Sequence, residues 1–98
     1  MLIHIVLMEF ANPADAEETE RRLKTLPAKI PVIRELAVGR NVVQTDRRPD
    51  GRQWTLGLYM KFDSVEDLDV YKATEEHRYA SKYAQGTRSE SAACDFYV

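Results

Sequence analysis

The segment from Leu2 to Phe10 limits the fold of this chain more than any other part, because it is apolar on both sides of an extended backbone. Alternate residues of a strand point to opposite faces. One face of this strand carries Leu2, His4, Val6, Met8 and Phe10. The other face carries Ile3, Ile5 and Leu7. A strand with two apolar faces must be covered on both, so we expect it to lie in the centre of a sheet.

The next part of the sequence predicts a helix followed by an antiparallel pair of strands. Asn12-Pro13 indicates the helix start, since proline is tolerated at the first helical position, and the helix is expected to end near Thr25 or Leu26. Apolar alternation predicts strands over Ile33–Val43 and Trp54–Phe62, joined by a charged loop over residues 44–53. The loop contains three arginines, Arg47, Arg48 and Arg52. They could bind phosphate or lie at a solvated hairpin tip, and we favour the solvated tip.

The second helix is predicted to break in the middle. It begins at Ser64 with acidic residues in its first turn, as the helix dipole favours. Thr74 is followed by two glutamates and repeats this pattern, so a new helix is expected to start there. That helix should run through Tyr83, and Gly86 should end it. A short strand over Ser91–Val98 then closes the chain.

The order of these elements is β-α-β-β-α-β, which is typical of an α+β, ferredoxin-like subunit. Residues 1–98 are expected to form this single domain, with two helices on one face of a four-stranded antiparallel sheet. The other face would expose Ile3, Ile5 and Leu7 unless something covered it. We therefore expect a homodimer in which two sheets pack face to face as a dimeric α/β barrel.

Composition excludes several classes of function. The formal net charge of −2 gives no field that would attract nucleic acid or an anionic membrane, and no apolar run is long enough to span a bilayer. The N-terminal run lacks the basic start and the cleavage site of a signal peptide. Cys94 is the only cysteine, so no internal disulfide can form. An intermolecular bridge and a small buried side chain are both conceivable for it; we favour the buried side chain and expect a cytoplasmic protein. No metal-ligand or nucleotide-binding motif is present, so we expect no metal and no cofactor.

Tyr71 and His77 are the candidates for chemistry. On a continuous helix a six-residue separation would place them about 120° apart, but a break at Thr74 would allow them to meet. An imidazole can accept a proton near neutral pH, and a phenol can donate a hydrogen bond to a developing oxyanion. The alternatives are a surface histidine and a core tyrosine. His4 is likewise either a core histidine or a pocket residue.

Two further tyrosines lie one helical turn apart, at positions Tyr79 and Tyr83. They would suit either a stacking platform for an aromatic ligand or packing against the sheet or a partner helix. We favour packing.

Four segments of the sequence resemble the stress-responsive dimeric α/β-barrel (Dabb) family: IHIVLMEF, LPAKIPVIRELAVGRN, FDSVEDLDVYKATEEH and CDFYV. The resemblance covers nearly the whole chain and implies a ferredoxin-like subunit whose homodimer forms a barrel. One member type, the plant polyketide cyclase that makes olivetolic acid, closes a ring by aldol chemistry without metal or cofactor. It uses a histidine base and a tyrosine six residues earlier, the spacing of Tyr71 and His77 here, and His4 matches a histidine on its first strand.

This sequence departs from the cyclase pattern at two places. Thr74-Glu75 stands where the family usually has His-Pro, and Thr19, Glu20 and Leu23 replace the pocket aromatics of the first helix. Three hypotheses follow.

The first hypothesis is a homodimer that binds a small apolar or aromatic molecule between sheet and helices, in a pocket lined by His4, Val6, Leu58 and Met60. The second is a cofactor-free cyclase, isomerase or monooxygenase with His77 as base and Tyr71 as hydrogen-bond donor. The third is a ligand-free, stress-linked structural protein.

Overall fold

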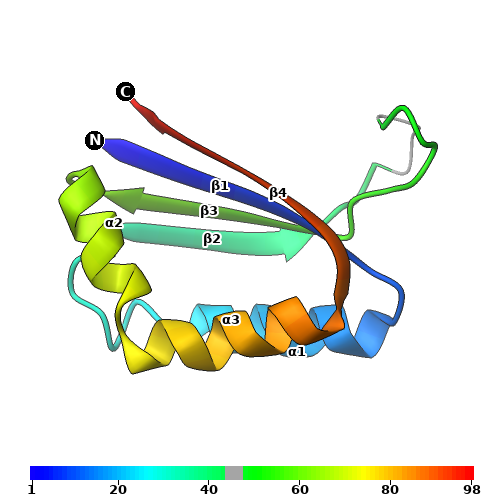
Figure 1. Ribbon diagram of the computed structural model, residues 1–98, viewed down its shortest axis with the longest axis horizontal. Coiled ribbons are helices and arrows are strands. Elements are labelled where there is room, and N and C mark those ends of the chain that lie inside the picture. Colours follow the sequence, from blue (N-terminus) through cyan, green and yellow to red (C-terminus); the bar gives the residue numbers. More distant parts are fainter. Residues whose placement is uncertain (44–47) are drawn as a thin grey trace.

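The computed structural model describes residues 1–43 and 48–98. Its elements, in chain order, are β1 (Leu2–Phe10), α1 (Pro13–Lys24), β2 (Glu35–Arg40), β3 (Leu56–Phe62), α2 (Val65–Lys72), α3 (Glu75–Thr87) and β4 (Arg88–Tyr97) (Figure 1). The strands form one antiparallel sheet in the order β2-β3-β1-β4. This is the predicted ferredoxin-like fold, with the second helix divided in two as expected.

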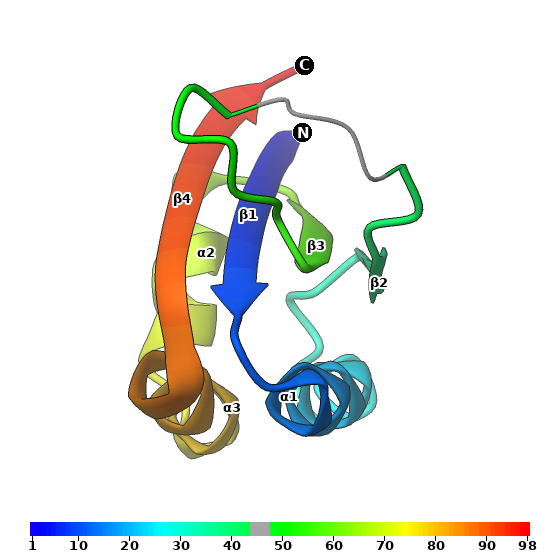
Figure 2. The same ribbon diagram turned by 90° about the vertical axis from the view of Figure 1, so that its right-hand side faces the viewer.

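The helices and the sheet form two layers with the core between them. α1 and α3 lie side by side beneath one face of the sheet (Figure 2), and α2 crosses one end of the space between the layers (Figure 1). β1 is central, as its two apolar faces predicted. The inward stripe of α1 is fully or almost fully buried and consists of Ala16, Thr19 and Leu23; Leu26, just beyond the helix end at Lys24, is buried as well.

The opposite face of the sheet has no helix over it. Ile5 and Leu7 are half-buried there, and a shallow apolar depression runs between them and the neighbouring strands β2 and β3. Ile3 is only 6% exposed, although we expected it in the open row, because it lies in register between Lys61 and Phe96. Cys94 is exposed on this face of edge strand β4, so the expectation of a buried thiol is wrong for the single subunit.

Several predicted boundaries need correction at the strand ends. β2 is shorter than the predicted strand, and Val42 beyond it is exposed. α3 ends at Thr87 rather than Gly86, and β4 starts directly after it at Arg88. Gly86 does not adopt the left-handed conformation of a terminating glycine. Arg88 instead has an extended backbone and pairs with Phe10, which converts the helix end into a strand.

Of the two described arginines of the hairpin loop, Arg52 is exposed, as expected for a solvated tip, whereas Arg48 is not. The Arg48 side chain is only 9% exposed; its guanidinium lies 4.2 Å from the centre of the Trp54 ring and pairs with Asp50 and Glu90. Arg52 pairs with Glu9 on β1. Arg47 lies outside the described residues. Because carboxylates already pair with Arg48 and Arg52, these residues tie the loop to β1 and β4, which argues against a phosphate site there.

Thr74 separates α2 from α3 in the way that its sequence context predicted. Its backbone is extended (φ −80°, ψ 152°), and its hydroxyl accepts a hydrogen bond from the His77 N–H at 3.1 Å. The same hydroxyl donates to the carbonyl oxygen of Tyr71 at 2.8 Å. One side chain therefore connects the backbones of the two residues that were candidates for chemistry.

Replacing Thr74 with alanine should lower the free energy of unfolding by roughly 0.5–2 kcal/mol, because it removes the helix cap. Thr74→Ser keeps the hydroxyl and should restore most of that loss. Urea denaturation followed by circular dichroism measures both values, and Ser91→Ala, an exposed serine on β4, serves as the control. An unchanged midpoint for Thr74→Ala would contradict the capping role.

Candidate functional site

A cavity of about 80 Å³ lies between the sheet and the helices. It has room for two or three water molecules or a small organic group. Every element except β2 contributes to its lining, which consists of His4, Val6, Met8, Leu23, Leu58, Tyr71, His77, Ala80, Ser81, Ala84 and Arg88. The structure thus brings together five of the six residues singled out in the sequence. Met60 is the exception, since it pairs with His4 across the strands but is fully buried in the core.

Tyr71 and His77 are in direct contact. Their ring centres are 4.6 Å apart in an edge-to-face arrangement with an interplanar angle of 69°. Phe62 packs on Tyr71 with a centroid distance of 5.5 Å. The two residues come from different helices, so the break at Thr74 produces the contact that a straight helix would prevent.

The surroundings of the two rings set their protonation states. Burial raises the pKa of the Tyr71 phenol well above its ordinary value, so the hydroxyl stays protonated and can donate a hydrogen bond. Burial is also the main cause that lowers the pKa of His77, and the charges of Lys72 and His4 act in the same direction. A hydrogen bond to the backbone of Lys72 partly opposes this shift. At neutral pH the site therefore presents a neutral imidazole beside a protonated phenol.

His4 has a partner that the sequence did not reveal. Its Nδ1 contacts a carboxylate oxygen of Asp95, the residue directly opposite it on β4. The His4 side chain is 11% exposed, while that of Asp95 is 38% exposed. A carboxylate that accepts a hydrogen bond from Nδ1–H fixes the orientation of the imidazole.

The described part of the chain contains no cluster of three or more histidine, cysteine, aspartate or glutamate side chains placed to hold a metal ion. Among the same residues, none of the helices has the length and apolar character needed to cross a membrane.

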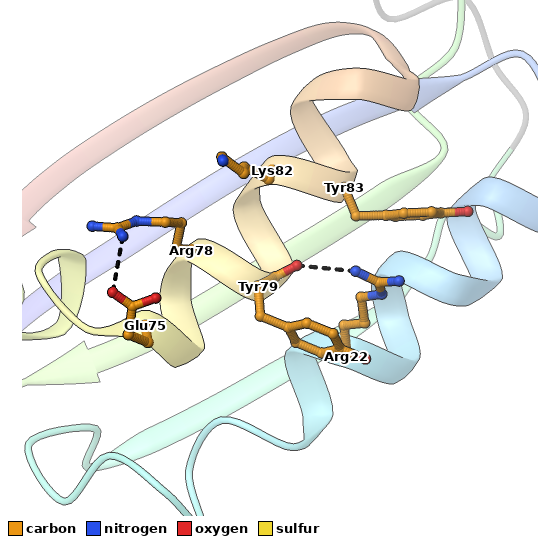
Figure 3. Close-up of a pocket in the computed structure, with 6 residues that line it drawn as sticks. All are labelled: Arg22, Glu75, Arg78, Tyr79, Lys82 and Tyr83. Atoms are coloured by element: carbon orange, nitrogen blue, oxygen red, sulfur yellow. Dashed lines mark hydrogen bonds and ion pairs between the residues drawn. The ribbon is translucent and has the colours of Figure 1, made fainter.

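A wider depression of about 470 Å³ lies on the outer surface of α1 and α3 (Figure 3). There the Arg22 guanidinium lies 4.3 Å from the ring centres of both Tyr79 and Tyr83, and it donates to the Tyr79 carbonyl oxygen at 3.1 Å. The two rings therefore pack on a side chain of the neighbouring helix α1, on the outer surface rather than against the sheet. Arg78 and Glu75 form an exposed ion pair beside them.

The model of the Stress Responsive A/B Barrel Domain family matches residues 2–98. No curated protein sequence matches the chain.

Solved structures were compared as well. A dimeric ferredoxin-like protein of unknown function from Bacteroides fragilis is 30% identical, with a TM-score of 0.82 over 99% of this chain and 95% of that one. A dimeric ferredoxin-like protein from Thermobifida fusca, also of unknown function, is 20% identical (TM-score 0.84; 99% and 90% covered). A hydroxynitrile lyase from Passiflora edulis is 16% identical (TM-score 0.83; 99% and 92% covered). The last two similarities show the fold alone.

Proposed function

The chain belongs to the stress-responsive A/B barrel domain (Dabb) family, and from this premise we propose that it is a homodimer whose subunits each bind a small molecule in the cavity between sheet and helices. We further propose that the cavity performs cofactor-free acid–base chemistry on a small carbonyl compound. The observation that carries this proposal is the convergence of His77, Tyr71 and His4 on one mainly apolar cavity.

Two observations support the dimer. The open face of the sheet exposes a continuous apolar surface that includes Ile5 and Leu7, and such a surface is typical of an interface. The similar proteins from Bacteroides fragilis and Thermobifida fusca are both described as dimeric. The residues that line the cavity lie on the helix side of the sheet, so packing against the open face would not cover them.

The proposed reaction is proton transfer next to a carbonyl group. The neutral imidazole of His77 takes a proton from the carbon beside the carbonyl, and the Tyr71 hydroxyl donates a hydrogen bond to the oxygen that becomes negative. A base and a donor in contact suit the isomerase or cyclase type of activity, which we therefore favour over a monooxygenase. The fold neighbour from Passiflora edulis is a lyase, which supports this class of chemistry on the fold.

The size of the cavity limits the substrate. A space of about 80 Å³ suits a small enolisable carbonyl compound better than a linear polyketide. The experiment is therefore a panel of small ketones, aldehydes and keto acids incubated with the protein in D₂O, with exchange of the protons beside the carbonyl followed by NMR. We expect faster exchange for at least one compound. If no compound exchanges and none shifts the amide signals of the cavity residues, the ligand-free structural role is supported instead.

A further inference from the structure

The polar groups of the cavity are divided between its two ends. Tyr71 on α2 and His77 in the first turn of α3 contribute from one end of α3, and Arg88 contributes from its other end, where β4 begins. Ser81 stands between them on α3, about 6 Å along the helix axis from His77 and about 10 Å from Arg88. The cavity lining therefore has acid–base groups near the start of α3 and a cation just beyond its end.

The guanidinium of Arg88 differs from every other arginine that the structure describes. Each of the others lies within 4.0 Å of a carboxylate oxygen of this chain; they are Arg21, Arg22, Arg34, Arg40, Arg48, Arg52 and Arg78. Within residues 1–43 and 48–98, Arg88 has no such partner, although it is half-buried and lines the cavity. Ser81 also lines the cavity, and its hydroxyl has no hydrogen-bond partner among these residues.

An unpaired cation at the wall of an apolar cavity favours an occupant that brings a negative charge. No aspartate or glutamate is among the lining residues, so the protein itself does not neutralise Arg88 there. Burying a charge is unfavourable unless it is paired and hydrogen-bonded, and guanidinium–carboxylate hydrogen bonds are among the stronger ones. A carboxylate that accepts from both Arg88 and Ser81 would satisfy these two donors together.

We propose that Arg88 and Ser81 form a carboxylate subsite and that the ligand class is small keto acids. In this arrangement the carboxylate lies at Arg88 and the carbonyl group lies toward Tyr71 and His77. The inference rests on the proposed function for the role of the second end, but the subsite itself depends only on Arg88 and Ser81.

The test uses a matched pair of probes, 4-oxopentanoate and its neutral amide, 4-oxopentanamide. Both are titrated at neutral pH against ¹⁵N-labelled protein, and the amide signals of α3 are followed. The carboxylate should bind about tenfold to hundredfold more tightly than the amide, because one charge-assisted contact is lost in the amide. Arg88→Gln should bring the two affinities together, and Arg88→Lys should retain part of the preference. Arg78→Gln, on the exposed side of the same helix, should leave it unchanged.

Each outcome separates the subsite from the proposed reaction. Equal affinities of the two probes for the wild type, or no binding of either, would overturn the carboxylate subsite. The carboxylate subsite would also be overturned if Arg88→Gln kept the preference for the carboxylate over the amide and Arg78→Gln lost it. The anion would then bind at the exposed Arg78 instead of at Arg88. Tight carboxylate binding without any His77-dependent proton exchange would support the subsite and contradict the proposed reaction. Arg88→Lys keeps the test valid if the glutamine variant fails to fold.

Discussion

His77→Ala is expected to lower the rate of proton exchange beside the carbonyl group about 10²–10⁴-fold, which is the contribution of a positioned general base. The side chain is half-buried, lines the cavity and touches Tyr71, so its loss removes the acceptor and leaves the capped helix start in place. Exchange is measured by NMR in D₂O with a compound that the wild type accepts. Arg78→Ala changes the next residue on the exposed side of α3 and should keep the wild-type rate.

Two further measurements distinguish a base from a packing residue. Tyr71→Phe keeps the ring but removes the hydroxyl, so it should slow exchange less than His77→Ala does. A His77→Ala variant as active as the wild type, or a Tyr71→Phe variant more impaired than it, would contradict the assigned roles. A loss of activity together with a collapsed circular dichroism spectrum would show a structural role instead.

The pH dependence follows from the environment of His77. Its folded-state pKa lies below the ordinary value of 6.5, mainly because of burial. The base is active when neutral, so the rate should fall as the pH drops through that lowered pKa, with a midpoint below 6.5. The lowered pKa also affects the free energy of unfolding. This contribution is fully present above the pKa that His77 has in the unfolded chain. It is lost as the pH falls from that value through the lower folded-state pKa, because the unfolded chain binds the proton more readily. NMR titration of the His77 ring measures this pKa directly.

The features that the sequence predicted well have causes within a few residues. Thr74 illustrates this, because a threonine followed by two glutamates is a helix start whatever packs around it, and its hydroxyl binds the His77 N–H as expected. Asn12 likewise accepts from the Ala14 N–H at 3.0 Å. The position of β1 in the sheet follows from two apolar faces of one short segment. The contact between Tyr71 and His77 then results from a local break in the chain.

The features that the sequence did not predict depend on residues far apart in the chain. Asp95 meets His4 across 91 residues of separation, and only the register of β1 with β4 brings them together. That register could have been inferred by pairing the two terminal strands, but several registers are compatible with their apolar patterns. Met60 lies on the same face of the sheet as His4 but is fully buried in the core. Strand alternation predicts the face of the sheet, whereas the packing of the helices determines where on that face the cavity lies. Arg88 reaches the cavity because β4 begins three residues earlier than its apolar pattern indicated.

Replacing Ile5 with aspartate is expected to convert the dimer into monomers. Ile5 lies on central strand β1, half-buried in the single subunit, and Tyr59 and Cys94 are its register partners on the two neighbouring strands. In a face-to-face pair of sheets this position would be enclosed, and an unpaired carboxylate buried there is strongly unfavourable. Light scattering after size-exclusion chromatography should give about twice the 11.3 kDa chain mass for the wild type and a single chain mass for the variant.

A matched control separates loss of the interface from loss of the fold. Val70→Asp places the same charge on an exposed apolar residue of α2, away from the open face, and should leave the dimer intact. Tyr59→Asp introduces the charge on β3 and should dissociate the dimer even if Ile5→Asp unfolds the subunit. A wild type that runs as a monomer, or an Ile5→Asp variant that stays dimeric, would refute the face-to-face arrangement. Dissociated but folded subunits would show that the two layers on the helix side suffice for the fold, and that the open face serves assembly.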